Sequence, residues 1–247
     1  MMKMKNTPLT KKSWKTAALL GAWVMMVGAA QAGPVTPKLV SVSGGLGVLD
    51  TSTGLEWVQD WNLAKTSGYD SNGRMTWSES VAWIAKLNAD NYAGHSDWRL
   101  ANTDTTASSN CSNNSNPGGG FAQQYYGYGC TGSEMGHLFY EALGGKQGQS
   151  ILNSAGDSQA EMDNLKLFKN VQSNLYWSGT EYAPNSSSAW YFDTFDGFQS
   201  NFDKLNSLYA LAVRPGDVAA AVPEPQTLAL TLLALTGALL ARRRRAL

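Results

Sequence analysis

The chain has 247 residues, of which 19 are acidic and 19 basic, so its formal net charge is zero. Five lysines and four arginines lie near the two ends, so residues 33–222 keep 10 basic and 18 acidic residues, a net charge of −8. An acidic body argues against nucleic-acid binding, which needs basic patches, and is explained most simply by solubility. About 190 residues between the ends suffice for one domain with a hydrophobic core.

The N-terminus combines five lysines before residue 16 with an uncharged run that ends at Ala30-Gln31-Ala32. A basic region, an apolar region and an A-x-A site are the parts of a secretory signal peptide. We expect residues 1–32 to direct export through the Sec machinery and to be cleaved, leaving a domain over residues 33–221. The alternative is an uncleaved N-terminal membrane anchor.

The first part of this domain predicts two strands, 46–49 and 55–58, joined by a turn rich in Asp, Ser, Thr and Gly. Residues 60–73 are polar and predict a loop. A helix is then expected, because Thr76 and Glu79 form a capping box. Its apolar face is expected to carry Trp77, Val81, Ile84 and Leu87.

Residues 102–131 differ in kind, being rich in Asn, Ser, Thr and Gly, and so long a structureless loop indicates a functional segment or an insertion. Cys111 and Cys130 are the only cysteines and both lie in it. Export to an oxidising compartment and an even count favour one disulfide, worth about 3 kcal/mol in the chain-entropy model. A zinc pair is disfavoured, since two thiols do not complete a site.

A second helix is expected over residues 133–143, with Met135, Leu138, Phe139 and Ala142 inside and Gly144 as its stop. Residues 145–169 carry no clear pattern. Residues 174–214 alternate aromatic or branched with polar side chains, which predicts an antiparallel β meander with one wet and one packed face. Asp196-Gly197 predicts a tight primed hairpin turn within it.

The C-terminus joins three features in order: Pro223, Glu224 and Pro225, then the apolar run 227–241, then Arg242, Arg243, Arg244 and Arg245. As a helix, the fifteen residues of the apolar run would span only about 22 Å, which is short of a hydrocarbon core of about 30 Å. In this order the tail, residues 222–247, resembles the PEP-CTERM sorting signal of Gram-negative bacteria. The resemblance implies a transient membrane helix, removal by an exosortase, and a setting of exopolysaccharide or biofilm production.

Four further pieces resemble the Lcl C-terminal domain family, an exported bacterial module of unknown function. They are Asp50-x-x-Thr53-Gly54-Leu55-x-Trp57, the helix opening at Thr76-Trp77, the bend Gly94-x-x-Asp97-Trp98-Arg99-Leu100, and Tyr176-Trp177-Ser178 followed by Ala189-Trp190, Lys204 and Val213-Arg214. The resemblance covers most of residues 42–215. It implies an α+β, C-type-lectin-like fold of a meander with two helices, and it carries no catalytic residues.

This chain departs from the family pattern in two places. Ala101 stands where the family usually has proline, and Glu134-Met135 is displaced from the bend by the 102–131 insertion. The Ala183-Pro184-Asn185 turn lacks the acid of calcium-dependent lectins, and both cysteines lie outside the late core used by formylglycine-generating enzymes. Neither of those two activities is therefore expected.

The candidate site residues have structural alternatives. His95 and His137 are the only histidines and are expected to be structural or on the surface, without metal. Asp97, Trp98 and Arg99 fit an internal ion pair beside a core indole better than a binding site, and Arg214 is expected to pair with an acid such as Asp97. Carboxylates for hydrolysis would come from Glu56, Asp193, Asp196 and Asp203, with surface charge as the simpler interpretation.

Tyr125, Tyr126 and Tyr128 are the best ligand candidates, since exposed aromatic rings stack on sugars and anchor interfaces, although packing of the insertion against the body is the favoured interpretation of these rings. We therefore expect a non-enzymatic surface or matrix module, without a cofactor, that binds exopolysaccharide or another envelope protein. The alternative is an envelope enzyme, either a hydrolase or a copper-dependent oxidase.

Overall fold

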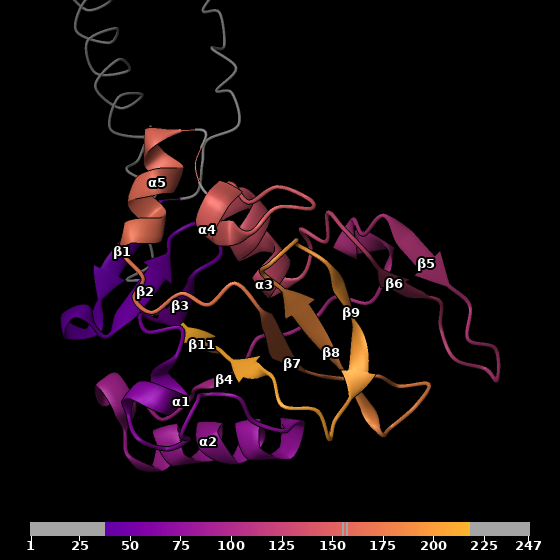
Figure 1. The fold of residues 1–247 in the computed structure, drawn as a ribbon, viewed down its shortest axis with the longest axis horizontal. Helices are drawn as coiled ribbons and strands as arrows, with labels where there is room; N and C mark the ends of the chain where they lie inside the picture. The colour runs from indigo at the N-terminus through magenta and orange to yellow at the C-terminus, as the bar shows by residue number, and fades with distance from the viewer. Residues whose placement is uncertain (1–37, 155, 157, 218–247) are drawn as a thin grey trace, which may run out of the picture. The chain divides into compact units, whose positions relative to one another are not determined.

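Two β-sheets carry the fold in the computed structural model, which describes residues 38–154, 156 and 158–217 (Figure 1). The signal peptide and the sorting tail expected from the sequence lie outside the described residues. The first sheet has the order β1 (Leu39–Val42), β2 (Gly47–Asp50), β3 (Leu55–Val58), β11 (Ala212–Pro215) and β4 (Arg99–Leu100). The second has the order β10 (Tyr209–Ala210), β7 (Leu175–Glu181), β8 (Ser188–Asp193) and β9 (Gln199–Asp203).

The expected hairpin at the start of the domain is confirmed, as β2 and β3 pair antiparallel from Gly47 opposite Val58 to Asp50 opposite Leu55. Strand β1 pairs with the other edge of β2, an addition that the sequence pattern does not predict. The mixed helical and strand content of the described residues agrees with the expected α+β class.

The prediction of one continuous meander is wrong beyond β9. Strands β7, β8 and β9 are antiparallel neighbours, but β10 pairs parallel with β7, and β11 joins the first sheet between β3 and β4. The prediction of one wet face is also wrong, because adjacent residues Tyr176 and Trp177 are both fully buried. Alternation along the sequence could not reveal that both faces of β7 and β8 are covered.

The turn between β8 and β9 keeps its hairpin but not the expected type. Only Gly197 has a positive φ, of 82°, whereas a primed two-residue turn needs positive φ at both central residues or at the first. The register pairs Phe192 with Gln199, so the connection is longer than two residues. Gly197 still takes the left-handed position that the turn requires.

Helix α2 (Trp77–Ala89) begins as predicted, with a complete capping box between Thr76 and Glu79. Its apolar face is rotated from the prediction, because Trp83 is buried and Val81 is 43% exposed. The expected loop before it contains a short helix, α1 (Leu63–Thr66). Trp77 remains half-buried, and its indole N–H donates to the carbonyl of Ser178 on β7.

The second expected helix is confirmed as α3 (Glu134–His137), which continues into a π-helical turn, η4 (Leu138–Ala142). The four apolar residues predicted to lie inside are buried in these two elements. Gly144 follows at φ 67° as its stop. The stretch without a clear pattern holds α4 (Ile151–Ser154) and α5 (Gln159–Lys166). Helix α5 has a capping box from Ser158 and Glu161, whose spacing in the sequence is the one local signal for this helix.

The insertion is ordered rather than structureless. It contains the single turn η3 (Ala107–Ser109) and the two-stranded hairpin of β5 (Asn113–Ser115) and β6 (Gln124–Tyr126). Two further single turns, η1 (Ser43–Gly45) and η2 (Tyr92–Gly94), flank the first sheet. Within the described part of the chain, no helix is long and apolar enough to cross a bilayer.

Candidate functional site

A disulfide closes the insertion, and backbone hydrogen bonds at Gly127 attach it to β9. Cys111 and Cys130 form the predicted disulfide, and Cys130 is fully buried. Gly127 exchanges two backbone hydrogen bonds of 2.8 Å with Gln199 on β9. The hairpin β5–β6 is therefore held beside β9, as Figure 1 shows, while its loop extends away from this attachment.

The three candidate tyrosines do not share one environment. Tyr128 packs edge-on against Phe198 at a centroid distance of 4.9 Å, and its hydroxyl donates to Asp196 at 3.3 Å. Desolvation and the charge of Asp196 raise the pKa of the Tyr128 hydroxyl, so Tyr128 keeps its proton at neutral pH. Tyr125 and Tyr126 are consecutive in β6, so they face opposite sides of the hairpin. Both are partly exposed, and these two remain available to a ligand.

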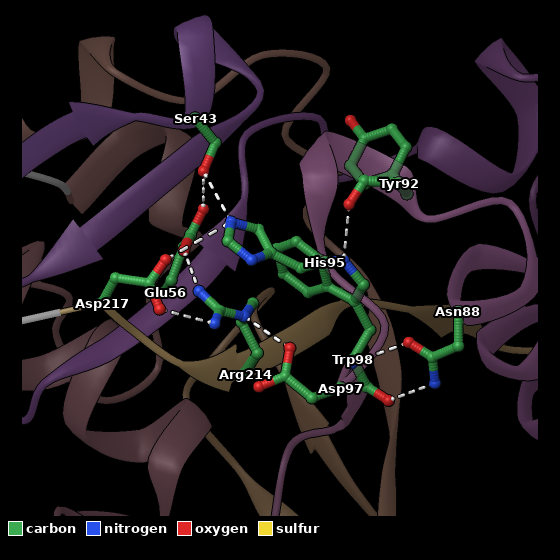
Figure 2. Close-up of polar contacts among 9 residues, drawn as sticks. All are labelled: Ser43, Glu56, Asn88, Tyr92, His95, Asp97, Trp98, Arg214 and Asp217. Atoms are coloured by element: carbon green, nitrogen blue, oxygen red, sulfur yellow. Dashed lines mark hydrogen bonds and ion pairs between the residues drawn. The ribbon is translucent and has the colours of Figure 1, made fainter.

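Arg214 on β11 is a buried arginine that binds three acidic side chains (Figure 2). It contacts Glu56 at 2.6 Å, Asp97 at 2.7 Å and Asp217 at 2.9 Å. Arg214 is 5% and Glu56 2% exposed. Burial opposes the charge on Arg214, but the hydrogen bonds that it donates to these acids outweigh burial and raise the pKa of Arg214. We call these four residues the Arg214 cluster; its Asp97–Arg214 pair confirms the prediction.

A pocket of about 320 Å³ opens beside the Arg214 cluster. Ser43 and Ala93 line it, and both have positive φ, at 52° and 57°, which costs non-glycine residues free energy. The Ser43 hydroxyl donates to Glu56 at 2.5 Å, and His95 lies 3.4 Å from Ser43. The sequence did not predict this pocket; the run Ser43-Gly44-Gly45 was its one available signal.

Two Ser–His–Asp groupings invite comparison with a hydrolase. In the first, Nε2 of His95 lies 3.4 Å from Ser43 Oγ and 3.7 Å from Asp217; in the second, Nε2 of His137 lies 3.3 Å from Ser52 Oγ and 3.2 Å from Asp50. A catalytic triad uses the two ring nitrogens separately, one for serine and one for the acid. Because one nitrogen serves both partners in each grouping, neither has triad geometry.

The profile of the Lcl C-terminal domain matches residues 47–214, more than half of the chain. The chain belongs to the Lcl C-terminal domain family. No curated protein matches it, and no solved structure matches it.

The bend that marks this Lcl C-terminal domain is a structural connector. The Asn88 side chain bonds both backbone groups of Trp98, at 2.8 and 2.9 Å, and the buried Trp98 indole donates to Tyr92. Arg99 forms a two-pronged ion pair with Glu134, with both bonds at 2.7 Å. The insertion separates Glu134 from the bend along the sequence, but the fold brings Glu134 into contact with Arg99 of the bend.

The other carboxylates considered for hydrolysis organise turns of the domain. Asp193, Asp196 and Asp203 each accept a hydrogen bond from the backbone N–H two residues later, at 2.8 to 2.9 Å. They lie at the ends of β8 and β9, whereas Glu56 lies in the first sheet within the Arg214 cluster. The structure therefore does not gather these acids with Glu56. The described residues contain no group of three or more His, Cys, Asp or Glu suited to a metal.

We predict that Arg214→Met destabilises the domain by about 3–5 kcal/mol, because it leaves Glu56 buried without a counter-ion. Urea unfolding of the full chain measures this loss. Lys166→Met is the matched control, since it breaks an exposed ion pair with Asp163 and should cost less than about 1 kcal/mol. A loss for Arg214→Met as small as the control would contradict a structural role, and adding Glu56→Gln should recover part of the loss.

Asp50 gives a prediction that depends on pH. Burial raises its pKa, but hydrogen bonds from His137 and Ser52 outweigh burial, so the pKa lies below 3.8. A lowered folded-state pKa stabilises the fold above the unfolded value and loses that contribution as pH falls through the folded pKa. Asp50→Asn should therefore lower the free energy of unfolding at pH 5 by about 1.5–3 kcal/mol, and the gap to wild type should narrow by pH 2.5.

Urea titrations at these two pH values measure the gap. Asp90→Asn, which affects only an exposed pair with Lys86, is the control. A gap of equal size at pH 5 and pH 2.5 would show that Asp50 does not act through its charge.

Proposed function

We propose that this Lcl C-terminal domain is an exported binding or structural module of the cell surface or biofilm matrix. Its insertion hairpin is the proposed contact with exopolysaccharide or another envelope protein. The observation that carries the proposal is the hairpin itself, covalently closed, fixed to β9, and presenting Tyr125 and Tyr126 partly exposed. Rigid aromatic side chains bind sugars and proteins at little conformational cost.

The internal use of polar groups supports binding rather than catalysis. Arg214 binds Glu56 and Asp97, and Arg99 forms a two-pronged ion pair with Glu134. A catalytic acid or base needs access to substrate and a proton to transfer. The observation that favours the alternative, an envelope hydrolase, is the pocket lined by the strained Ser43 and Ala93. A copper-dependent oxidase has no comparable observation in its favour.

The proposed route to the surface comes from the two ends of the sequence. The signal peptide would pass the chain to the Sec machinery, and the short apolar run 227–241 would halt it in the inner membrane with the terminal arginines inside. An exosortase would then cut near Val222–Pro225. The disulfide supports export, since such bonds persist in oxidising compartments. We also propose that the fold is C-type-lectin-like, on the family resemblance alone.

We predict that neutral substitution of Arg242, Arg243, Arg244 and Arg245 weakens membrane arrest and tail removal together, because these arginines would keep the end of the apolar run 227–241 on the cytoplasmic side. Changing the same four residues to lysine keeps the charge and is the matched control. The measurement is the C-terminal peptide of the surface protein, by mass spectrometry, in cells with and without the exosortase. Intact Leu247 on the surface form in both strains would rule out this route.

We predict that Tyr125→Ala with Tyr126→Ala weakens retention of the full chain in the extracellular matrix, with little change in melting temperature, because both rings are partly exposed. Adding Tyr128→Ala should lower the melting temperature, since that ring packs on Phe198. Leu205→Ala, which removes an 84% exposed apolar side chain outside the insertion, is the control for non-specific adhesion. Unchanged retention of the Tyr125, Tyr126 double variant would refute the hairpin as the contact.

A further inference from the structure

A second pocket, of about 390 Å³, lies at the C-terminal half of α2, away from the insertion. Its walls come from the segment after α1, from α2 and from η2, and include three aromatic residues and one ion pair. They are Tyr69, Trp83, Tyr92, Lys86 and Asp90. This volume is within the range of about 300–1,000 Å³ that small-molecule sites occupy.

Trp83 supplies a hydrogen-bond donor that the protein does not use. Its side chain is 1% exposed, and its indole N–H has no partner among the described residues. The indoles of Trp77, Trp98 and Trp177 donate to backbone carbonyls at 2.9 to 3.0 Å, whereas those of Trp57, Trp61 and Trp190 are unpaired like that of Trp83. Of these four unpaired indoles, the one that lines this pocket is Trp83. A buried unpaired donor destabilises the fold, and an indole can only donate. The pocket therefore favours an occupant that brings an acceptor oxygen.

The charged part of the wall is internally balanced. Lys86 contacts both carboxylate oxygens of Asp90, at 2.6 and 2.7 Å, one helical turn apart on α2. The pair presents a donor and an acceptor with no net charge. An ionic ligand would have to break this pair, whereas hydroxyl groups can bond to its edges.

The aromatic part of the wall is fixed on one side and open on the other. Tyr92 lies between Asn91 and Ala93, both in the left-handed conformation at φ 50° and 57°, and its ring packs edge-on against Trp98 at 5.9 Å. Burial raises the pKa of Tyr92, so its hydroxyl stays protonated at neutral pH. Tyr69 is 39% exposed and stands at the mouth. The rings offer apolar faces and the hydroxyls offer polar edges.

We propose that this pocket is a saccharide subsite for one neutral sugar ring. A pyranose matches the wall, because it has an apolar face for Tyr69 or Tyr92 and many oxygens for the Trp83 indole and the Lys86–Asp90 pair. The ligand class agrees with the binding of exopolysaccharide under the proposed function, and this inference rests on that function. The pocket is nevertheless distinct in residues from the insertion hairpin, so the two sites can be tested apart.

The test uses the full chain labelled with 5-fluorotryptophan, in a detergent without a sugar headgroup. Each of the nine tryptophans gives a ¹⁹F signal, and loss of one signal in Trp83→Phe assigns that residue. The probes are the methyl glycosides of glucose, galactose and N-acetylglucosamine, each titrated to about 50 mM, because one sugar ring gives millimolar affinity. Glycerol at the same concentration reports solvent effects.

We expect the Trp83 signal to shift and saturate with at least one glycoside and not with glycerol. Tyr69→Ala should weaken this binding about fivefold or more, while Val81→Ala, a 43% exposed position on the same helix as Trp83, should not. Tyr69 is at the surface, so this variant tests the site even where Trp83→Phe fails to fold.

No shift with any of the three glycosides would overturn the subsite, and so would a shift that Tyr69→Ala leaves unchanged. Matrix retention of the hairpin variants is scored separately. Loss of retention without a Trp83 shift leaves the proposed function standing and this inference wrong. A Trp83 shift with normal retention of the hairpin variants supports the subsite and contradicts the hairpin contact.

Discussion

The ion cluster around Arg214 is the constraint on which the rest of the domain depends. Arg214 lies on β11, the strand that reaches the first sheet only after the chain has built the second. Its three acids come from β3, from the bend before β4 and from the end of the described chain. One buried cation therefore joins the first strands to the last. Removing a single partner would leave an uncompensated buried charge, which is among the most costly defects a core can contain.

This use of charge separates the interior of the domain from its recognition surfaces. The acids that the sequence suggests for hydrolysis, together with Arg99 and Arg214, are bound to each other or to turn backbones. The surfaces that we propose for a partner are aromatic: Tyr125 and Tyr126 on the insertion, and Tyr69 beside Trp83 at α2. An acidic body that binds through aromatic rings suits neutral sugars better than nucleic acid or anionic polymers.

Local signals in the sequence predicted local structure well. The Thr76–Glu79 capping box marks a helix start without help from the rest of the fold, whereas the same chemistry at Ser158 is hard to recognise because the surrounding stretch lacks an apolar pattern. The Asp97–Arg214 pair was also predictable, because a buried arginine must find an acid. The disulfide was predicted from the expected export and an even cysteine count.

Non-local features were not predictable in the same way. Period-2 alternation says nothing about which sheet a strand enters, so it does not predict the transfer of β11 to the first sheet. A helix of 13 residues fixes its buried face by contacts made elsewhere, which is why Trp83 and not Val81 points inward. The pocket beside Glu56 needs Ser43 and Ala93 in left-handed conformations, and only the neighbouring glycines hinted at these.

The central claim is that recognition uses aromatic surfaces while the buried charges serve the fold. Hydrogen–deuterium exchange of the full chain, with and without polysaccharide from the producing cells' own matrix, tests it most directly. The account predicts added protection in peptides covering Tyr125–Tyr126 and around Tyr69 and Trp83, with no change around Glu56 and Arg214. Added protection centred on the pocket of Ser43, Glu56 and His95, with none at the aromatic surfaces, would contradict it.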